Sequence, residues 1–420
     1  MQIAPPLRAA VIIPTISGRP FVEQAIASIK AQAMPADILI VAPAGAPILA
    51  SGVTVIRLRE NLGSAGGYFI GGRWAYDQAY ELIIFADDDA ILDEHDTIER
   101  LMASRRQGRP VSYIALASGG PFLPNLYGTM GREVLQKIGF HFKDFFHVRE
   151  DIELDWRLRR HGYEPAVVRL GKFTHPAPGV SKKTYSPGLL YYVARNSIAF
   201  KLGYGRLASA MGMWLMYSSI LLSSLMGGRP GFAGALGRSF ADVLTGRLGE
   251  RSIRSSETLE SETGLSLADV AARRHVIVGY AESFSKPGLP SLNIVSSGRL
   301  LSLSEGLGSL KNMLELMRAA WGMDYVIYES SEMRYSFLSY FGKQVLAYRA
   351  LDGKLALIRR NGLLAPLQAG LCLGLSALWT LAAVLPLIAV SFIYKKRFLS
   401  WEKESIAYDI GQHIAGVEKK

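Results

Sequence analysis

The chain has 420 residues, 49% of them hydrophobic, and a formal net charge of +11. Its length predicts two or three domains, and its single cysteine, Cys372, excludes a disulfide framework or a thiolate metal site within one chain. The apolar content indicates membrane contact, while the charge suits nucleic acid, an anionic bilayer or a phosphorylated substrate. The single cysteine also indicates a reducing compartment, and because the start lacks a signal-peptide pattern, we expect the first two hundred residues to stay where they are made.

Strand-like and helix-like segments alternate over the first quarter of the chain. The apolar, β-branched runs are 9–14, 36–42, 53–58 and 81–86, and the helix-like segments are 20–33, 66–80 and 94–107. This order predicts an α/β fold, with a Rossmann-like, mostly parallel sheet and helices on both faces. Ligands of such folds bind beyond the carboxyl ends of the strands.

Three consecutive carboxylates, Asp87, Asp88 and Asp89, follow the fourth strand-like run. Because they repel one another, they need a cation, and Asp87 and Asp89 are suitable oxygen ligands for Mg²⁺ or Mn²⁺. A diphosphate substrate would explain such a metal ion. A structural alternative stays open, in which these residues cap the helix that follows.

Two further patterns follow along the chain. Glu150 and Asp151 open a helix-like segment in which Glu153 and Arg157 have the spacing of an ion pair, and His175 comes after the strand-like run "PAVVRL". Taken singly, the acids are compatible with a role at a helix N-terminus, and the histidine with a structural role. Their order on one sheet-based domain favours a shared site.

The same region resembles the inverting family 2 glycosyltransferases of the GT-A fold, especially the galactofuranosyltransferase and rhamnosyltransferase branch. The similar stretches occur in the family's order within roughly residues 9–204 and read "VIIPTISGRP", "NLGSAGGYFIGG", "IIFADDDAIL", "REDIELDWRLRRHGY", "FTHP" and "YYVARNSIAF". The resemblance implies that Asp87 and Asp89 bind Mn²⁺ or Mg²⁺ with His175 as a third ligand. It also implies that Asp151 is the general base, with Glu150 beside it.

The resemblance further implies a binding site for a nucleotide-sugar donor. The implied lining residues are Thr15, Arg19, Asn61, Gly66, Gly67 and Asp88. Glycines between a strand and a helix would let backbone N–H groups approach phosphate oxygens, although they also suit a simple turn. The family usually has an acidic residue after the second strand, whereas this chain has "PAGAP" at 43–47. The choice between UDP and dTDP donors therefore stays open.

The second half contains two long uncharged runs, 207–228 and 363–394, which both exceed the roughly 18 residues needed for a transmembrane candidate. For the first we favour a docked or interfacial helix. For the second, both a single span and a re-entrant hairpin bent at Pro366 or Pro386 are open. We expect a helical segment and a polar linker at 205–269, followed by a small α/β region at 270–362. A hairpin in this region is predicted to turn at Asp352-Gly353. We expect a membrane-embedded segment at 363–397, and then a tail at 398–420 that is either an amphipathic helix or a solvated end.

These patterns predict a metal-dependent inverting glycosyltransferase on the cytoplasmic face of the membrane, with a catalytic domain at 1–204. Its donor would be a UDP or dTDP sugar, with galactofuranose or rhamnose favoured, and its acceptor a lipid-linked or membrane-associated glycan of the cell wall or of another polysaccharide. No nucleic-acid partner is expected, and a homo-oligomer is compatible with the sequence. Two alternatives remain: a sugar-nucleotidyltransferase, and a non-catalytic membrane scaffold that binds nucleotide sugars or glycans.

Overall fold

A computed structural model of the chain describes residues 8–16, 21–116, 126–174, 186–253, 261–279, 294–296, 316–328, 337–349 and 354–420. The chain divides into two compact units. Unit 1 comprises Met1–Ala177, Leu248–Arg251 and Arg397–Lys420, and unit 2 comprises Pro178–Arg247 and Ser252–Lys396. The predicted boundary at residue 204 is therefore wrong. Helix α6 (Pro187–Gly203) belongs to unit 2, because it packs against helices α7 (Leu207–Met226) and α8 (Pro230–Leu244).

Unit 1 is built on an eight-stranded sheet with the order β14-β3-β2-β1-β4-β6-β5-β7. Its strands are β1 (Ala9–Pro14), β2 (Asp37–Pro43), β3 (Thr54–Leu58), β4 (Leu82–Ala86), β5 (Val111–Leu116), β6 (Leu126–Gly131), β7 (Ala166–Leu170) and β14 (Ile414–Lys419). Strands β3, β2, β1 and β4 are parallel neighbours, whereas β6 and β14 run antiparallel to the strands beside them. The predicted α/β class and mostly parallel sheet are confirmed, and the arrangement is consistent with a GT-A, Rossmann-like fold.

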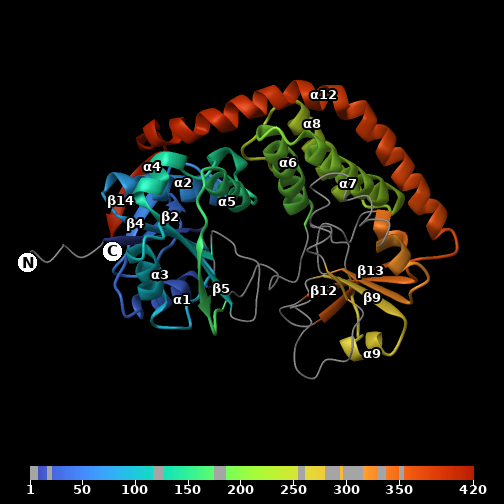
Figure 1. Cartoon of the computed structure of the whole chain (residues 1–420), viewed down its shortest axis with the longest axis horizontal. Helices are drawn as coiled ribbons and strands as arrows, with labels where there is room; N and C mark the ends of the chain where they lie inside the picture. The colour runs from blue at the N-terminus through green and yellow to red at the C-terminus, as the bar shows by residue number, and fades with distance from the viewer. Residues whose placement is uncertain are drawn as a thin grey trace, which may run out of the picture. The chain divides into compact units, whose positions relative to one another are not determined.

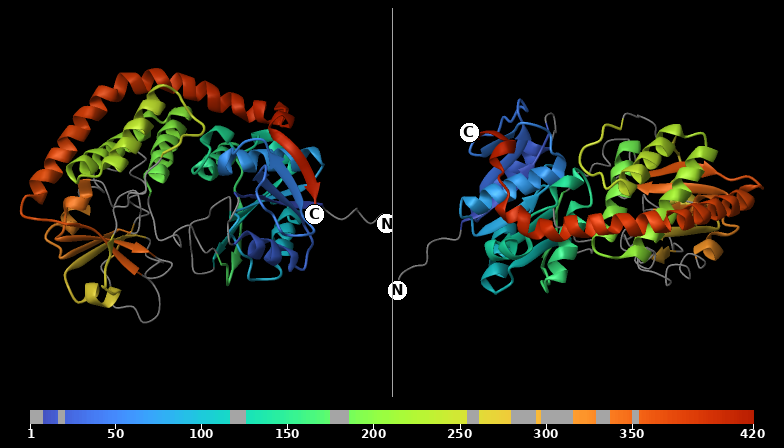
Figure 2. Two further views of the ribbon diagram at one scale, coloured as in Figure 1. Left: turned by 180° about the vertical axis from the view of Figure 1, so that it is seen from behind. Right: turned by 90° about the horizontal axis from the view of Figure 1, so that it is seen from above.

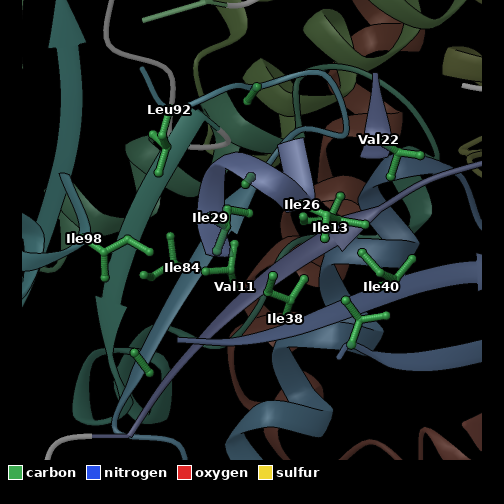
Figure 3. Close-up of a cluster of buried hydrophobic side chains, with 14 of the residues drawn as sticks. Val11, Ile13, Val22, Ile26, Ile29, Ile38, Ile40, Ile84, Leu92 and Ile98 are labelled. Carbon is green, nitrogen blue, oxygen red and sulfur yellow. The ribbon is translucent and has the colours of Figure 1, made fainter. Parts of the chain in front are cut away.

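Helices cover both faces of this sheet because alternate strand residues point to opposite sides. On one face, Val11 and Ile13 of β1 and Ile84 of β4 pack with α1 (Val22–Lys30) and α3 (Thr97–Arg106) in one buried cluster. Figure 3 shows these side chains pointing toward Ile26 and Ile29 of α1. The other face of β1, including Ile12, packs against α2 (Gly63–Asp77).

Glycines allow α2 to approach the sheet closely. A Cβ atom added at Gly67 would lie 2.6 Å from the Cβ of Pro14, and one at Gly71 would lie 2.4 Å from Cγ2 of Ile12. Real Cβ atoms do not approach other atoms so closely, so larger residues would force the helix away from β1. The glycine-rich segment therefore brings the N-terminus of α2 to the end of β1.

The last residues of the chain complete the sheet of unit 1. Strand β14 pairs antiparallel with β3, and Figure 2 shows it in red beside the blue N-terminal strands. Before this strand, Phe398 stacks on Phe142 with ring centroids 4.3 Å apart, and the indole N–H of Trp401 donates to the carbonyl of His141 at 3.0 Å. Of the predicted tail at 398–420, the first residues are helical up to Ala407, at the end of helix α12 (Ala365–Ala407), whereas the solvated end is wrong for Ile414–Lys419, because these residues pair with the edge of β3 and satisfy its backbone groups.

Unit 2 contains α6, α7 and α8 together with a six-stranded sheet of order β10-β9-β11-β12-β13-β8. These strands are β8 (Ser261–Glu262), β9 (His275–Gly279), β10 (Ile294–Ser296), β11 (Tyr325–Tyr328), β12 (Gln344–Arg349) and β13 (Lys354–Arg360), and a short helix, α9 (Leu267–Ala271), precedes β9. The predicted antiparallel pair β12–β13 is confirmed. Its predicted turn residues, Asp352 and Gly353, lie outside the described residues. Part of the predicted linker instead forms β8, which pairs with β13.

Helix α12 (Ala365–Ala407), the long red-orange helix in Figure 1, is continuous, with Pro386 inside it. The predicted re-entrant hairpin is therefore wrong. In the described part of the chain, α7 and α12 are the helices long and apolar enough to cross a membrane. In the most apolar 18 residues of each helix, 50% of the residues are buried in α7 and 28% in α12. Most of α12 within unit 2 is thus not covered by protein.

Candidate active site

The carboxylates that follow β4 lie at the carboxyl end of a buried strand, as predicted. Asp87 and Asp88 are half-buried, and Asp89 is 7% exposed. Thr15, which directly follows the neighbouring strand β1, donates a hydrogen bond from its hydroxyl to Oδ2 of Asp88 at 2.6 Å. The ends of two adjacent parallel strands therefore contribute polar side chains to one place, which is where ligands of α/β sheets bind.

Helix α2 connects this cluster with a second pair of acids. The hydroxyl of Tyr68 donates to Oδ1 of Asp87 at 2.5 Å, and the hydroxyl of Ser64 donates to Oε1 of Glu150 at 2.7 Å. Ser64 and Tyr68 are four residues apart on the helix, so their side chains point the same way. Glu150 opens α5 (Glu150–Arg160). Carboxylates from distant parts of the sequence thus share one site through a single turn of α2.

Burial and charge crowding shift the protonation of this site. Burial and the neighbouring Asp151 carboxylate raise the pKa of Glu150 to about 8, and Asp87 acts in the same direction. Burial, followed by the charge of Asp87, also raises the pKa of Tyr68 well above its ordinary value, so its hydroxyl remains a donor. The concentration of negative charge makes a bound cation favourable here.

Asp151 is placed by an unusual backbone turn before α5. Phe146, Val148 and Arg149 have φ angles of 65°, 57° and 74°, in the left-handed region that residues with side chains rarely adopt. Such conformations cost about 1–3 kcal/mol each and cluster at functional sites. Asp151 itself is half-buried, and burial raises its pKa although Oδ1 accepts the N–H of Ile152 at 2.8 Å.

Gly63 allows this strained turn to contact α2. It has a φ of +68°, and a Cβ atom added to it would lie 1.9 Å from the carbonyl oxygen of Phe146. The same oxygen accepts a hydrogen bond from the N–H of Ala65 at 3.2 Å. The start of α2 and the turn before α5 therefore hold each other in place.

The predicted donor-site residues have local structural roles as well. Oδ1 of Asn61 accepts the N–H of Gly63 at 3.0 Å, so Asn61 satisfies the first backbone N–H of α2. Gly66 and Gly67 lie inside α2 rather than in a loop before it, and the N–H of Gly66 donates to Leu62. Arg19 lies outside the described residues. Contact of these residues with a donor remains a prediction.

The predicted metal ligand His175 also lies outside the described residues. The residue before it, Thr174, forms an antiparallel bridge with Ile91, with N–H to carbonyl distances of 2.8 and 3.2 Å. Ile91 is two residues after Asp89. Among the residues that the structure describes, no three His, Cys, Asp or Glu side chains form a group that could hold a metal ion. Of the three predicted metal ligands, the described residues are Asp87 and Asp89, which offer their carboxylate oxygens.

Several residues of the site were not predicted from the sequence. Ser64 and Tyr68 were not predicted, although their four-residue spacing on the helix after the glycine motif was a usable signal. His147 also contributes, with Nδ1 3.2 Å from the Ser64 hydroxyl. The predicted pair of Glu153 and Arg157 is confirmed as a buried ion pair of 2.7 Å, which anchors α5.

Comparisons with known proteins give only distant structural likeness. No protein-family model and no curated protein sequence matches the chain. One similar solved structure is S. aureus TarS, with 16% identity and a TM-score of 0.33 over 46% of this chain and 39% of that chain. Another is a glucosyl-3-phosphoglycerate synthase from Mycobacterium tuberculosis in complex with Mn²⁺, uridine-diphosphate and phosphoglyceric acid, with 14% identity and a TM-score of 0.34 over 45% and 78%. We therefore base the functional conclusion on the residues of this chain.

Proposed function

We propose that this protein is a metal-dependent, inverting glycosyltransferase, which moves a sugar from a nucleotide-diphosphate donor to a lipid-linked or membrane-associated glycan. The observation that carries the proposal is the series of contacts from Asp87 through Tyr68 and Ser64 to Glu150. A diphosphate leaving group requires a cation, and an incoming hydroxyl requires a base. A site that joins two separate groups of carboxylates provides for both.

The carboxylates of Asp87 and Asp89 suit Mn²⁺ or Mg²⁺, with His175 as the proposed third ligand. Such cations are commonly held by one or two protein carboxylates together with substrate phosphates, so this donor set fits. When bound, the cation stabilises the negative charge that develops on the departing diphosphate. The bridge between Thr174 and Ile91 supports His175, because it joins the segment before this histidine to the segment after Asp89.

Asp151 is the proposed general base. It is half-buried at the start of α5, so an acceptor hydroxyl can reach it, and its raised pKa makes it a stronger base than an ordinary aspartate. The acceptor oxygen bonds to the anomeric carbon as the bond to the diphosphate oxygen breaks, and the hydroxyl proton passes to Asp151. One such displacement inverts the anomeric centre. Glu150, buried and bonded to Ser64, positions its neighbour.

The donor would lie near Thr15 and Asp88, with Arg19, Asn61, Gly66 and Gly67 around it. The hydrogen bond from Thr15 to Asp88 supports this assignment, because it joins the ends of β1 and β4. The sequence resemblance favours galactofuranose or rhamnose, carried by UDP or dTDP. The subclass of transferase and the acceptor follow from that resemblance alone.

Association with the cytoplasmic face of a membrane is proposed through α12. Within unit 2 one stripe of this helix is buried: Ala365, Ala369, Cys372, Ser376, Thr380, Ala383, Leu387, Val390 and Tyr394. Up to Ile393 the opposite side exposes large apolar residues: Leu364, Leu367, Leu371, Leu375, Leu378, Leu381, Leu385, Ile388 and Phe392. After Tyr394 the exposed residues become charged, as at Lys395, Lys396 and Lys403. This change within one helix supports lipid contact for the first part.

The enzymatic proposal is tested with purified protein, Mn²⁺ or Mg²⁺, a panel of nucleotide sugars and a membrane lipid extract as acceptor. We expect nucleoside diphosphate release with one donor. The Asp151→Asn variant should lower turnover about 10²- to 10⁴-fold while donor affinity is kept. Asp155→Asn, one turn further along α5, is the matched control and should remain active. With added pyrophosphate, formation of a nucleoside triphosphate and a sugar 1-phosphate from the nucleotide sugar would indicate a sugar-nucleotidyltransferase, and full activity of Asp151→Asn would rule out the proposed base.

Membrane association is tested by flotation with neutral phosphatidylcholine vesicles. The variant Leu371→Gln/Leu378→Gln should lose most vesicle binding, because two exposed apolar side chains are removed from α12. Leu49→Gln, at an 85% exposed position of unit 1, should bind as the wild type does. Equal binding of all three proteins would contradict lipid contact through α12.

A further inference from the structure

Unit 2 contains a cavity of about 260 Å³ where the end of α7, the short helix η5 (Phe337–Tyr340), the end of β13 and the start of α12 meet. Its lining residues are Ser223, Ser224, Met226, Gly227, Arg229, Ser339, Tyr340, Ile358, Arg359, Arg360, Asn361 and Gln368. The volume lies just below the range of about 300–1,000 Å³ that is typical of sites for drug-sized ligands. The cavity therefore suits a small ligand or the head group of a larger one.

Three residues that line this cavity carry buried hydroxyl groups without a hydrogen-bond partner among the residues that the structure describes. The residues are Ser224, Ser339 and Tyr340, which are 3%, 1% and 3% exposed. Their side-chain oxygens are buried, and no described residue bonds to them. A buried hydroxyl without a partner is unfavourable because it loses its hydrogen bonds to water, so three in one cavity indicate that a polar ligand or water completes them.

The charges of the lining residues decide between a polar ligand and water. Arg229, Arg359 and Arg360 all line the cavity, and none of the lining residues that the structure describes is an aspartate or glutamate. The guanidinium of Arg359 is held in place, since Nη2 donates to the Ser223 hydroxyl at 3.0 Å and its carbon lies 3.9 Å above the Tyr340 ring. Positive groups gathered in a concave site without acids favour an anion over water.

We propose that this cavity binds a phosphate-type anion. Serine and tyrosine hydroxyls and arginine N–H groups are all donors, and arginine matches the geometry of phosphate oxygens with two parallel hydrogen bonds. Asn361 is occupied elsewhere, because its amide donates to the carbonyls of Ser339 and Gly342 at 3.0 and 2.8 Å. The donors left for the anion are the three hydroxyls, the guanidinium of Arg360 and the N–H groups of Arg359 other than the one bonded to Ser223.

Two sources offer this chemistry: a free phosphate compound and the head group of an anionic lipid. Gln368, in the first turns of α12, lines the cavity, and the nearby Leu364 and Leu367 are 65% and 72% exposed. An anionic head group in the cavity would place its acyl chains beside this apolar side of the helix. The site requires no sugar transfer, so it is independent of the proposed function of unit 1.

The test uses the full chain and two arms. Inorganic phosphate is titrated by calorimetry, and phosphatidylcholine vesicles with and without phosphatidic acid are compared by flotation. The variant Arg359→Gln/Arg360→Gln should weaken anion binding at least about tenfold, because hydrogen bonds to charged groups contribute roughly 1.5–3 kcal/mol. Arg238→Gln, which removes one exposed positive charge of α8 in the same unit, is the control and should change binding less than about twofold.

Ser339→Ala separates the cavity from general attraction between charges. It keeps every arginine but removes a buried donor, so it should weaken binding several-fold at unchanged thermal stability. Binding in either arm that depends on Arg359, Arg360 and Ser339 supports the site, and the arm that responds identifies the source. Absence of binding in both arms, or an equal effect of Arg238→Gln, would overturn the proposal.

Discussion

The two units of this chain gather charges of opposite sign. In unit 1, Asp87, Asp88, Asp89, Glu150 and Asp151 form the candidate active site, whereas in unit 2 three arginines line a cavity in which no described lining residue is acidic. Each arrangement is costly without a partner of the opposite charge. The two proposed sites therefore bind ligands of opposite charge, a cation in unit 1 and an anion in unit 2, and each site is formed by the sheet and helices of its own unit.

The strongest test of this comparison removes one acid of unit 1. Asp89→Asn should lower turnover by at least about 10²-fold, because a bound metal ion contributes several kcal/mol to leaving-group stabilisation. Mn²⁺ binding, measured by calorimetry without substrate, should weaken in parallel. Asp96→Asn, which changes an exposed aspartate seven residues later, is the matched control. Unchanged Mn²⁺ affinity in Asp89→Asn would contradict the cation site.

The second test concerns the backbone that joins the two acid groups. Gly63→Ala should destabilise unit 1 by about 3 kcal/mol, because its Cβ meets the carbonyl oxygen of Phe146 and its φ is positive. Gly45→Ala is the control: Gly45 also has a positive φ, of +84°, but nothing lies within 4 Å of its added Cβ. It should cost only about 1 kcal/mol. Thermal unfolding distinguishes the two, and equal effects would mean that the contact with Phe146 is unimportant.

A third test uses the pH dependence of stability. The pKa of Glu150 is raised to about 8 in the folded protein, so the folded state binds this proton more tightly than the unfolded state. This stabilisation is complete below the ordinary pKa of a glutamate and is lost as the pH rises through about 8, at up to about 1.4 kcal/mol per pH unit. In a buffer with chelator, Glu150→Gln should therefore exceed the wild type in melting temperature at high pH and by less at low pH. Glu99→Gln, at an exposed position, should follow the wild type throughout.

The smallest expected effect compares one buried serine from each unit. Ser405 of unit 1 accepts the N–H of Phe140 at 3.1 Å, so Ser405→Ala should destabilise by about 1–2 kcal/mol. Ser339 of unit 2 has no partner among the described residues, so Ser339→Ala in anion-free buffer should be neutral or slightly stabilising. Phosphate should raise the melting temperature of the wild type more than that of Ser339→Ala. An equal loss of stability in both variants would show that Ser339 is already satisfied.

The sequence predicts the first four strands and three helices of unit 1 within a few residues, because each is a compact run with clear periodicity. The acids of the site were also readable, since Asp87–Asp89 and Glu150–Asp151 are contiguous in sequence and follow recognisable elements. The antiparallel pair of β12 and β13 could be predicted for the same reason. Local patterns with one dominant period are sufficient for elements of this kind.

Other parts depend on pairing between distant residues and gave no local signal. Strand β14, "IAGVEK", contains a glycine and two charged residues and is a strand only because β3 offers an open edge. The cavity of unit 2 is assembled from four separate segments, so its three arginines never form a motif. Gly67, one of the two glycines predicted to contact a donor, is also explained by close packing of α2 on β1, whereas Gly66 packs against Leu62.

The strand β14 also affects how a growing chain acquires its structure. Strand β3 emerges from the ribosome more than three hundred residues before the segment that covers its edge, and all of unit 2 is synthesised in between. During this time the nascent sheet keeps an unpaired margin, which is a site for wrong association with other chains. Completion of the sheet of unit 1 therefore waits until the chain of unit 2 has been synthesised, and until then the exposed edge of β3 is a target for a chaperone.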